Sequence, residues 1–224
     1  MKSHRKIATI TGSLFLIAMF SSLVGGGIIE SIVSAPDFLK AVMDQSGSIW
    51  TGVMLELLNG IAVVGIAVAL YSILKGYNET LAVGYLGIRI LESISCIIPA
   101  MKPLALLTIA EKYVAAGSPG ESYFQTIGSS LLAERAEIMG LLVPIFFSLS
   151  ALLFYIFLFQ TKALPRFISI WGFIGVASIM VLNIFRIEVP LGMILAAPII
   201  LNEIFLGFWL IIKGFNPEKL KRSQ

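Results

Sequence analysis

Apolar residues in this chain run in long blocks, and short polar segments separate the blocks. A block of about 18 or more apolar residues is typical of a transmembrane helix, because at 1.5 Å per residue such a helix crosses a hydrocarbon core of about 30 Å. The pattern predicts an all-α, integral membrane bundle of six transmembrane helices, forming a single domain over 1–224. The predicted spans cover about 7–29, 49–74, 81–101, 138–159, 167–187 and 191–212.

The connections between spans indicate how neighbouring helices are arranged. KGYNET at 75–80 and QTKALPR at 160–166 are short enough to force antiparallel neighbours, and we expect a tight turn at 188–190. The basic start MKSHRK before the first apolar block also resembles a secretory signal peptide. That block is longer than the about 7–15 residues of a signal-peptide core, and no small-residue cleavage site follows it. We therefore interpret it as the first span.

The segment at about 103–137, between the third and fourth spans, has a helical organisation of its own. Pro103 suits a helix start, and Gly117 suits the position just after a helix end. SPGES at 118–122 is a turn sequence in which Ser122 is a candidate helix N-cap. A second helix then follows and runs towards the fourth span. We expect this outer helical segment to lie at the outer interface or to cap the bundle, either as a connector or as a lid.

Lysine and arginine residues are distributed unevenly between the two sets of connections. In membrane proteins the cytoplasmic connections carry the excess of basic residues. The sequence therefore predicts that both termini are cytoplasmic and that the segment at 103–137 is outside. The ten residues on the predicted cytoplasmic side are Lys2, Arg5, Lys6, Lys75, Lys162, Arg166, Lys213, Lys219, Lys221 and Arg222, the five outside are Lys40, Lys102, Lys112, Arg135 and Arg186, and Arg89 lies within a span.

Composition narrows the chemistry that the chain can support. Hydrophobic residues make up 58% and charged residues 13%, and the basic residues flank apolar spans, so the partner is the lipid bilayer and not a nucleic acid. The one cysteine, Cys96, excludes an intrachain disulfide and a thiolate metal cage, and the one histidine, His4, excludes histidine-based triads and bis-histidine haem. We expect no metal, no cofactor and no catalytic set of a known motif; the oligomeric state stays open.

Polar and charged residues interrupt four of the predicted spans. Even the lowest insertion scale assigns a central charge a cost of about 2.5–3.5 kcal/mol, so such residues are expected in the bundle interior and in contact with one another. Arg89 and Glu92 lie three apart, which places them on one helix face, and we expect Arg89 to pair with Glu92 or with a glutamate of the second or sixth span. The candidate ligand-binding or proton-linked residues are Glu56, Asn59, Arg89, Glu92, Asn183, Arg186, Asn202 and Glu203.

The central charges of these spans do not balance. Arg89 is one cation, whereas Glu56, Glu92 and Glu203 are three candidate anions. A carboxyl group that is desolvated beside like charge tends to keep its proton, as a proton-linked carrier requires. The same polar contacts could instead hold an inert bundle in register, at about 0.6 kcal/mol each.

Several stretches of the chain resemble a known bacterial family. They are ITGSLFLIA, LELLNGIAVVGIAVALYSILKGYNETLAVGYLGIRILES, SYFQTIGSSLLA and LPRFISIWGFIG, and the similarity covers nearly the whole chain. The family consists of six-span membrane proteins catalogued only as a domain of unknown function. The resemblance implies the same helix count and a location in the bacterial plasma (inner) membrane, and it implies no activity and no catalytic residues.

The sequence thus supports two classes of function, with a third left open. The first is a small carrier or binding protein for an amphipathic, lipid-like or anionic solute, in which Arg89 binds the anion and Glu56, Glu92 or Glu203 is proton-linked. The second is a membrane-embedded enzyme that uses a glutamate as general acid and base on a lipid substrate, although the spans offer no evident nucleophile. The third is a structural or regulatory membrane partner.

Overall fold

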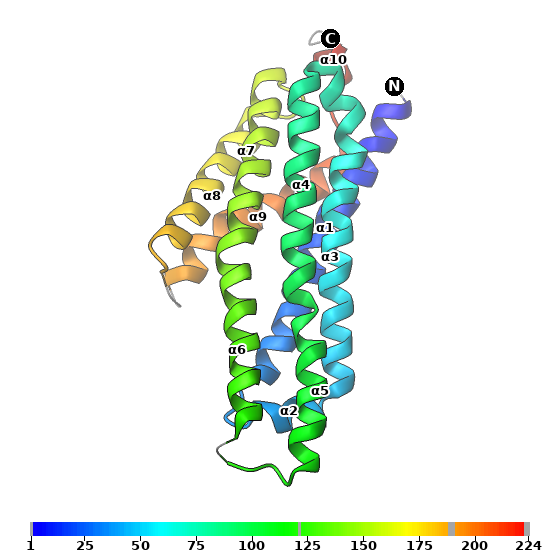
Figure 1. Cartoon of the computed structure of the whole chain (residues 1–224). Helices are drawn as coiled ribbons and strands as arrows, with labels where there is room; N and C mark the ends of the chain where they lie inside the picture. The colour runs from blue at the N-terminus through cyan, green and yellow to red at the C-terminus, as the bar shows by residue number, and fades with distance from the viewer. Residues whose placement is uncertain (1, 121, 188–190, 222–224) are drawn as a thin grey trace.

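The chain folds into helices connected by short turns, as the computed structural model in Figure 1 shows. The structure describes residues 2–120, 122–187 and 191–221, and in these ranges it contains helices and no strand. Six helical stretches of the described residues are long and apolar enough to cross a membrane, which confirms the predicted six-span fold. They are His4–Val33, Ser46–Tyr77, Glu79–Ala115, Tyr123–Thr161, Arg166–Ile184 and Leu191–Ile212.

Some of these stretches contain more than one helical element. Glu79–Ala115 holds two helices with a break at Met101, and Tyr123–Thr161 holds two helices joined by one turn of π-helix. The elements are α1 (Lys2–Val33), α2 (Phe38–Asp44), α3 (Ser46–Tyr77), α4 (Glu79–Ala100), α5 (Lys102–Ala115), α6 (Tyr123–Glu137), the π-helix η1 (Ile138–Leu142), α7 (Val143–Thr161), α8 (Arg166–Ile184), α9 (Leu191–Ile212) and α10 (Pro217–Lys221).

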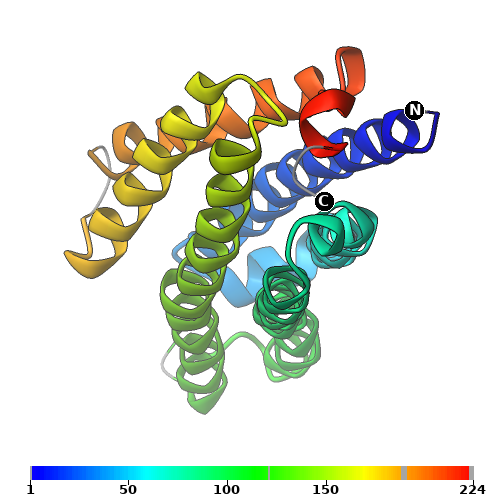
Figure 2. The same ribbon diagram turned by 90° about the horizontal axis from the view of Figure 1, so that it is seen from above.

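The six long elements form a ring in chain order. Each of α1, α3, α4, α7, α8 and α9 packs on the next, and α9 returns to pack on α1, so α1 lies between the α3–α4 pair and α9 (Figure 2). Helix α1 packs closely on α9 and on α3 at two pairs of glycine residues. A Cβ atom on Gly12 would lie 2.5 Å from the carbonyl oxygen of Gly207, and one on Gly25 would lie 2.8 Å from that of Gly52. Small residues at these crossings let the helix axes approach closely.

Sharp turns set the antiparallel order that the short connections predicted. Asn78 alone separates α3 from α4; its backbone is extended, and its side-chain oxygen accepts a hydrogen bond from the N–H of Leu81 at 2.8 Å. A side-chain acceptor at this position satisfies one of the free N–H groups of a helix start. The two ends of the chain lie at the same end of the bundle (Figure 1).

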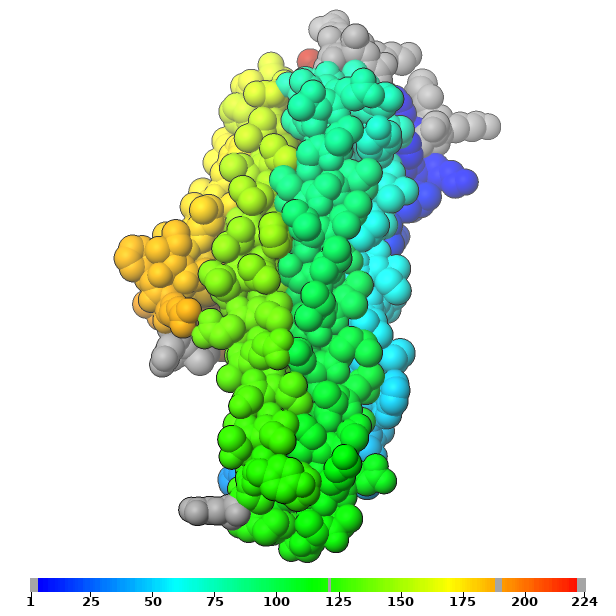
Figure 3. Space-filling model, viewed as in Figure 1, coloured from blue at the N-terminus to red at the C-terminus, as the bar shows by residue number. Residues whose placement is uncertain are grey.

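At the opposite end, the outer helical segment builds a second apolar core. Helices α2, α5 and α6 pack with the ends of α1 and α3 around a buried set of Ile29, Ile32, Leu39, Val42, Ile49, Val53, Leu106, Ala110, Tyr113 and Phe124. The stretch Glu79–Ala115 has 37 residues, about 55 Å of helix and therefore well beyond a hydrocarbon core of about 30 Å. Figure 3 shows this end reaching past the tips of α8 and α9.

In the outer helical segment the structure contains the helix start, the turn and the second helix that the sequence predicted. Helix α5 has Pro103 in its first turn and ends before Gly117, whose positive φ of 83° allows the N–H groups of Gly117 and Ser118 to bond back to α5. Ser122 is the N-cap residue of α6, although its side chain makes no capping hydrogen bond. The sequence prediction missed α2, whose short FLKAVMD pattern buries only Leu39 and Val42.

The fifth predicted span is too long at its outer end. Helix α8 ends at Ile184, and Arg186 has a positive φ of 46° that reverses the chain. The N–H of Ile187 then bonds to the carbonyl of Leu182 at 3.0 Å, as expected for a helix closed by a left-handed residue. The tight turn predicted at 188–190 lies outside the described residues.

Candidate functional site

Arg89 and Glu92 form a buried ion pair on α4. Both lie on α4 one turn apart, and Nη1 of Arg89 is 2.9 Å from Oε1 of Glu92, with side chains 3% and 4% exposed. Ser150 of α7 donates a hydrogen bond to the other carboxylate oxygen at 2.8 Å. Both oxygens of Glu92 are therefore occupied, and the pair links α4 to α7.

Aromatic rings surround the guanidinium group of Arg89. Its Nε donates to the hydroxyl oxygen of Tyr85 at 3.1 Å, and its Cζ lies 5.4 Å from the Tyr85 ring centre and 5.8 Å from that of Phe15 on α1. Ring faces attract a cation and partly replace the water that it loses on burial. The position of Arg89 is therefore set by α1 and α4 together.

A small cavity lies beside this pair, where α1, α3, α4, α7 and α9 meet. Its volume is about 210 Å³ and its walls are mostly apolar. The polar and sulfur-bearing side chains that line it are Met19, Ser22, Asn59, Arg89, Glu92, Cys96 and Glu203. We call this space the central cavity.

Glu203 is the carboxylate of the central cavity that lacks a cation at bonding distance. It is half-buried on α9 and interacts electrostatically with Arg89, but it makes no hydrogen bond or salt bridge with any other residue that the structure describes. Asn59 reaches the same cavity from α3. Of the eight residues predicted from sequence, four line this space: Asn59, Arg89, Glu92 and Glu203.

Asn202 neighbours Glu203 in sequence but has a different role. Its side chain is fully buried, accepts a hydrogen bond from the Tyr155 hydroxyl at 2.6 Å and donates one to the carbonyl of Ile168 at 3.0 Å. These bonds join α9 to α7 and α8. Since Asn202 does not line the central cavity, we interpret it as a helix-packing residue.

Glu56 pairs with an arginine that the sequence placed outside. Nη1 of Arg135 is 2.8 Å from Oε2 of Glu56, Nη2 contacts the other carboxylate oxygen, and the side chains are only 8% and 5% exposed. Arg135 also donates to the carbonyl of Pro99 at 2.7 Å. That carbonyl has no helical donor because residue 103, four positions on, is a proline without an N–H.

The sequence does contain a signal for the burial of Arg135. Phe124, Gly128 and Arg135 are the buried residues of α6, and their spacings of four and seven place them on one face of the helix. The prediction assigned Arg135 to the outer flank because it counted charges by segment and not by helix face. With Arg135 included, two cations serve three carboxylates, and the surplus is Glu203.

Asn183 and Arg186 do not join the central cavity, contrary to their place among the candidates. The amide of Asn183 donates within α8, to the carbonyl of Ile179 at 2.8 Å. Arg186 lies beyond the end of α8 and contacts Glu137 at 3.2 Å, with side chains 74% and 62% exposed. An exposed charged pair of this kind marks the outer boundary of the spans.

A second concavity, of about 490 Å³, lies between α1 and the α6–η1 stretch, and we call it the outer crevice. Its lining includes Gly26 and Met139, each one helical turn from a residue of the central cavity, Ser22 and Val143 respectively. The outer crevice and the central cavity therefore follow one another along the same two helices. The π-helix η1 lies at this junction, and π-turns occur often at functional sites.

Six helices long and apolar enough to span a membrane, around a small and mostly apolar cavity, define a multi-pass helical membrane protein. Over residues 10–214 the chain matches the model of the family described as "Domain of unknown function (DUF4386)", and it belongs to this family. A search of curated proteins and a search of solved structures gave no match.

Proposed function

We propose that the protein binds or carries a small amphipathic solute, which it takes into the central cavity. The observation that carries the proposal is Glu203, a carboxylate that lines this cavity and forms no salt bridge with another described residue, while apolar side chains form most of the cavity walls. A site of this kind combines an apolar space with one polar group that orients the ligand.

The charges of the central cavity favour a cationic or hydroxyl head group over an anionic one. Glu92 already balances the charge of Arg89, and two of the five N–H groups of Arg89 already donate to Glu92 and Tyr85. Glu203 instead presents oxygens that accept hydrogen bonds. An amine would balance the surplus carboxylate, whereas an anion would add to the surplus.

The size of the cavity limits what enters it. Its volume of about 210 Å³ is below the range of about 300–1,000 Å³ for sites that enclose drug-sized ligands. Either the solute is small, or its head enters while its tail stays in the outer crevice. On the side towards the chain ends, Phe154 packs on Phe15 and Tyr85 with ring centres 5.9 and 6.0 Å apart, so transport would require these rings to separate.

Matched six-carbon probes test the proposal. Purified protein in mild detergent is melted with hexylamine, hexanol or hexanoate, because a ligand that binds only the folded state raises the melting temperature. We expect hexylamine and hexanol to stabilise the protein more than hexanoate, and Glu203→Gln to remove the preference for the amine. Glu111→Gln, at an exposed site in α5, is the control of equal charge change. Equal responses to all three probes, or an amine preference that survives Glu203→Gln, would refute the proposal.

The enzyme alternative has less support from the same space. Among the described residues that line the central cavity, the thiol of Cys96 is the strongest nucleophile, and this side chain is only 8% exposed. A thiol this deeply buried acts as a small apolar packing group.

We also infer that both chain ends face the cytoplasm of a bacterial cell and that the second apolar core lies outside the inner membrane. The excess of basic residues at the end with the two termini supports this orientation. Impermeant thiol labelling of intact cells tests it, in a Cys96→Ala background that removes the one native cysteine. We expect Ser118→Cys to react from outside and Lys162→Cys to react only after lysis; the reverse pattern would invert the orientation.

A further inference from the structure

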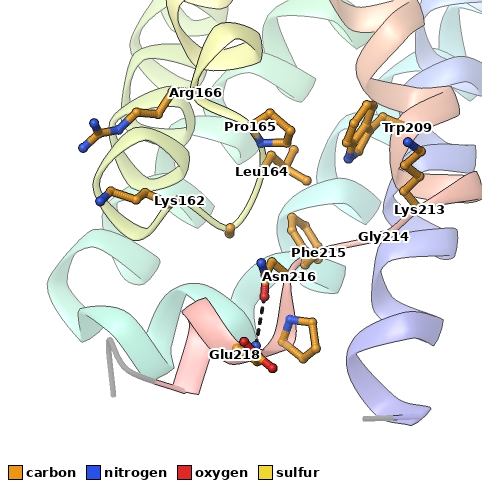
Figure 4. A pocket seen from close by; sticks show the side chains of 12 residues that line it. Lys162, Leu164, Pro165, Arg166, Trp209, Lys213, Gly214, Phe215, Asn216 and Glu218 are labelled. Carbon is orange, nitrogen blue, oxygen red and sulfur yellow. Dashed lines mark hydrogen bonds between the residues drawn. The ribbon is translucent and has the colours of Figure 1, made fainter.

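A surface concavity of about 780 Å³ lies at the end of the molecule that carries both termini (Figure 4). Leu164 and Pro165, between α7 and α8, form one wall, and Trp209 and Phe215, at the end of α9 and just after it, form the other. The N–H of Asn216 donates to the carbonyl of Ala163 at 2.8 Å, which fixes one wall to the other. The concavity is thus held by backbone contacts and has an apolar floor. We call it the terminal pocket.

Three cations surround the terminal pocket. They are Lys162, Arg166 and Lys213, and none forms a salt bridge with another described residue, whereas Lys75, Lys102, Arg135 and Arg186 all do. Figure 4 shows Lys162 and Arg166 at the outer edge of one wall, with their charged ends directed outward, and Lys213 beside Trp209 on the other.

Aromatic rings hold two of these cations in place. Cζ of Arg166 lies 4.9 Å from the ring centre of Phe159, and Nζ of Lys213 lies 4.7 Å from that of Trp209. Among the described lining residues Glu218 is the carboxylate, and Figure 4 shows it away from Arg166 and Lys213. The rim therefore keeps a net positive charge that no neighbour neutralises.

We propose that the terminal pocket binds the phosphate of an anionic phospholipid from the adjoining leaflet. The phosphate lies at the rim beside Lys213, while Lys162 and Arg166, at the outer edge of the opposite wall, add positive potential, and the glycerol and first methylenes contact the apolar floor. Trp209 is at the level where tryptophan marks the membrane–water interface. Exposed apolar side chains, Phe167, Phe208 and Ile212, continue from the pocket along α8 and α9, where acyl chains lie. A soluble phosphate compound would interact with the cations at the rim, but it has no acyl chain that could contact the apolar floor.

Native mass spectrometry of the full chain in neutral detergent tests this site. Phosphatidylglycerol and phosphatidylcholine with the same acyl chains are titrated separately, and glycerol phosphate supplies the head group without chains. Each cation near a lipid phosphate contributes about fivefold in affinity. We therefore expect phosphatidylglycerol to bind at least tenfold more tightly than phosphatidylcholine, and the variant Lys162→Gln/Arg166→Gln/Lys213→Gln to lose this preference.

The control variant removes three cations from the same end of the molecule. It is Lys6→Gln/Lys75→Gln/Lys219→Gln, and it should keep the preference for phosphatidylglycerol. The proposal fails if both triple variants behave alike, or if the first retains the preference. It also fails if glycerol phosphate binds as tightly as the lipid, because the ligand would then be a soluble phosphate compound. Unchanged melting temperatures establish that both variants are folded, since the replaced side chains are exposed or half-buried.

Discussion

The part of the chain that the structure describes contains two buried arginine–glutamate pairs, and they are built in different ways. Arg89 and Glu92 are three residues apart on one helix, whereas Glu56 and Arg135 are 79 residues apart and join α3 to α6. The first pair borders the central cavity, where Glu203 remains without a cation. In the second pair, Arg135 donates to both carboxylate oxygens of Glu56 and also to the Pro99 carbonyl. The Arg89–Glu92 pair thus borders a cavity, whereas the Glu56–Arg135 pair links α6 to α3.

Removing Arg135 should have the largest effect. Arg135→Ala leaves the Glu56 carboxylate buried without its cation and removes one donor from the Pro99 carbonyl, and breaking a buried pair in this way costs about 3–5 kcal/mol. Denaturant titration in mild detergent measures the loss. Arg186→Ala is the matched control, because its pair is exposed and should contribute about 0–1 kcal/mol. A loss at Arg135 as small as that at Arg186 would show that the second pair does not fasten the helices.

Removing Arg89 should cost less, about 2 kcal/mol, because Glu92 keeps its hydrogen bond from Ser150 and borders a cavity. Arg89→Ala should also strengthen the stabilisation by hexylamine, since two carboxylates then lack a cation. Melting curves with and without the amine measure both effects. A weaker amine response than in the parent would mean that Arg89 itself binds the solute.

Ser150→Ala should lower stability by about 1 kcal/mol, the usual contribution of one hydrogen bond. The hydroxyl lies 2.8 Å from Glu92 Oε2 and also 2.9 Å from the Phe147 carbonyl of its own helix, and its loss removes a donor from one buried carboxylate oxygen. Ser178→Ala is the control, because that hydroxyl bonds only to the carbonyl of Ile174 in its own helix and faces outward. Similar unfolding energies for the two variants would contradict a structural link between α4 and α7 through Glu92.

Glu203→Gln should have the smallest effect on stability, about 0.5 kcal/mol or less, because Glu203 has no salt bridge with a described residue. The same variant should change the response to hexylamine more than any other substitution in the central cavity. The pair of measurements distinguishes a ligand-facing group from a structural one. A large loss of stability with an unchanged amine response would assign Glu203 to helix packing.

The sequence predicted those features that depend on neighbouring residues. Block hydrophobicity located the spans, and the three-residue spacing of Arg89 and Glu92 located their shared helix face. It also predicted the start of α5 at Pro103 and the turn at Gly117. These features depend on periodicity and local backbone preference, so they can be predicted before any tertiary contact is known.

Features that depend on contacts between helices far apart in the sequence could not be predicted from local patterns. The partner of Glu56 is known only once α6 continues through η1 into α7 and turns Arg135 inward. The predicted fifth span extends three residues past the end of α8 at Ile184, and this places Arg186 among the candidate site residues although it lies beyond the helix. Asn202 and Glu203 are adjacent, and only the packing of α7 and α8 assigns one to a hydrogen-bond network and the other to the cavity.

The outer crevice has a consequence for how affinity must be expressed. Arg135 and Ala136 line it next to Glu137, whose exposed pair with Arg186 marks the boundary of the spans. An amphipathic solute accumulates in this boundary layer by partitioning, because its apolar part leaves water while its head stays hydrated. On the proposed function, the protein would therefore respond to the mole fraction of solute in the bilayer and not to its concentration in the buffer. Dissociation constants referred to the aqueous phase should change as lipid is added to a fixed amount of protein, whereas those referred to the membrane should stay constant.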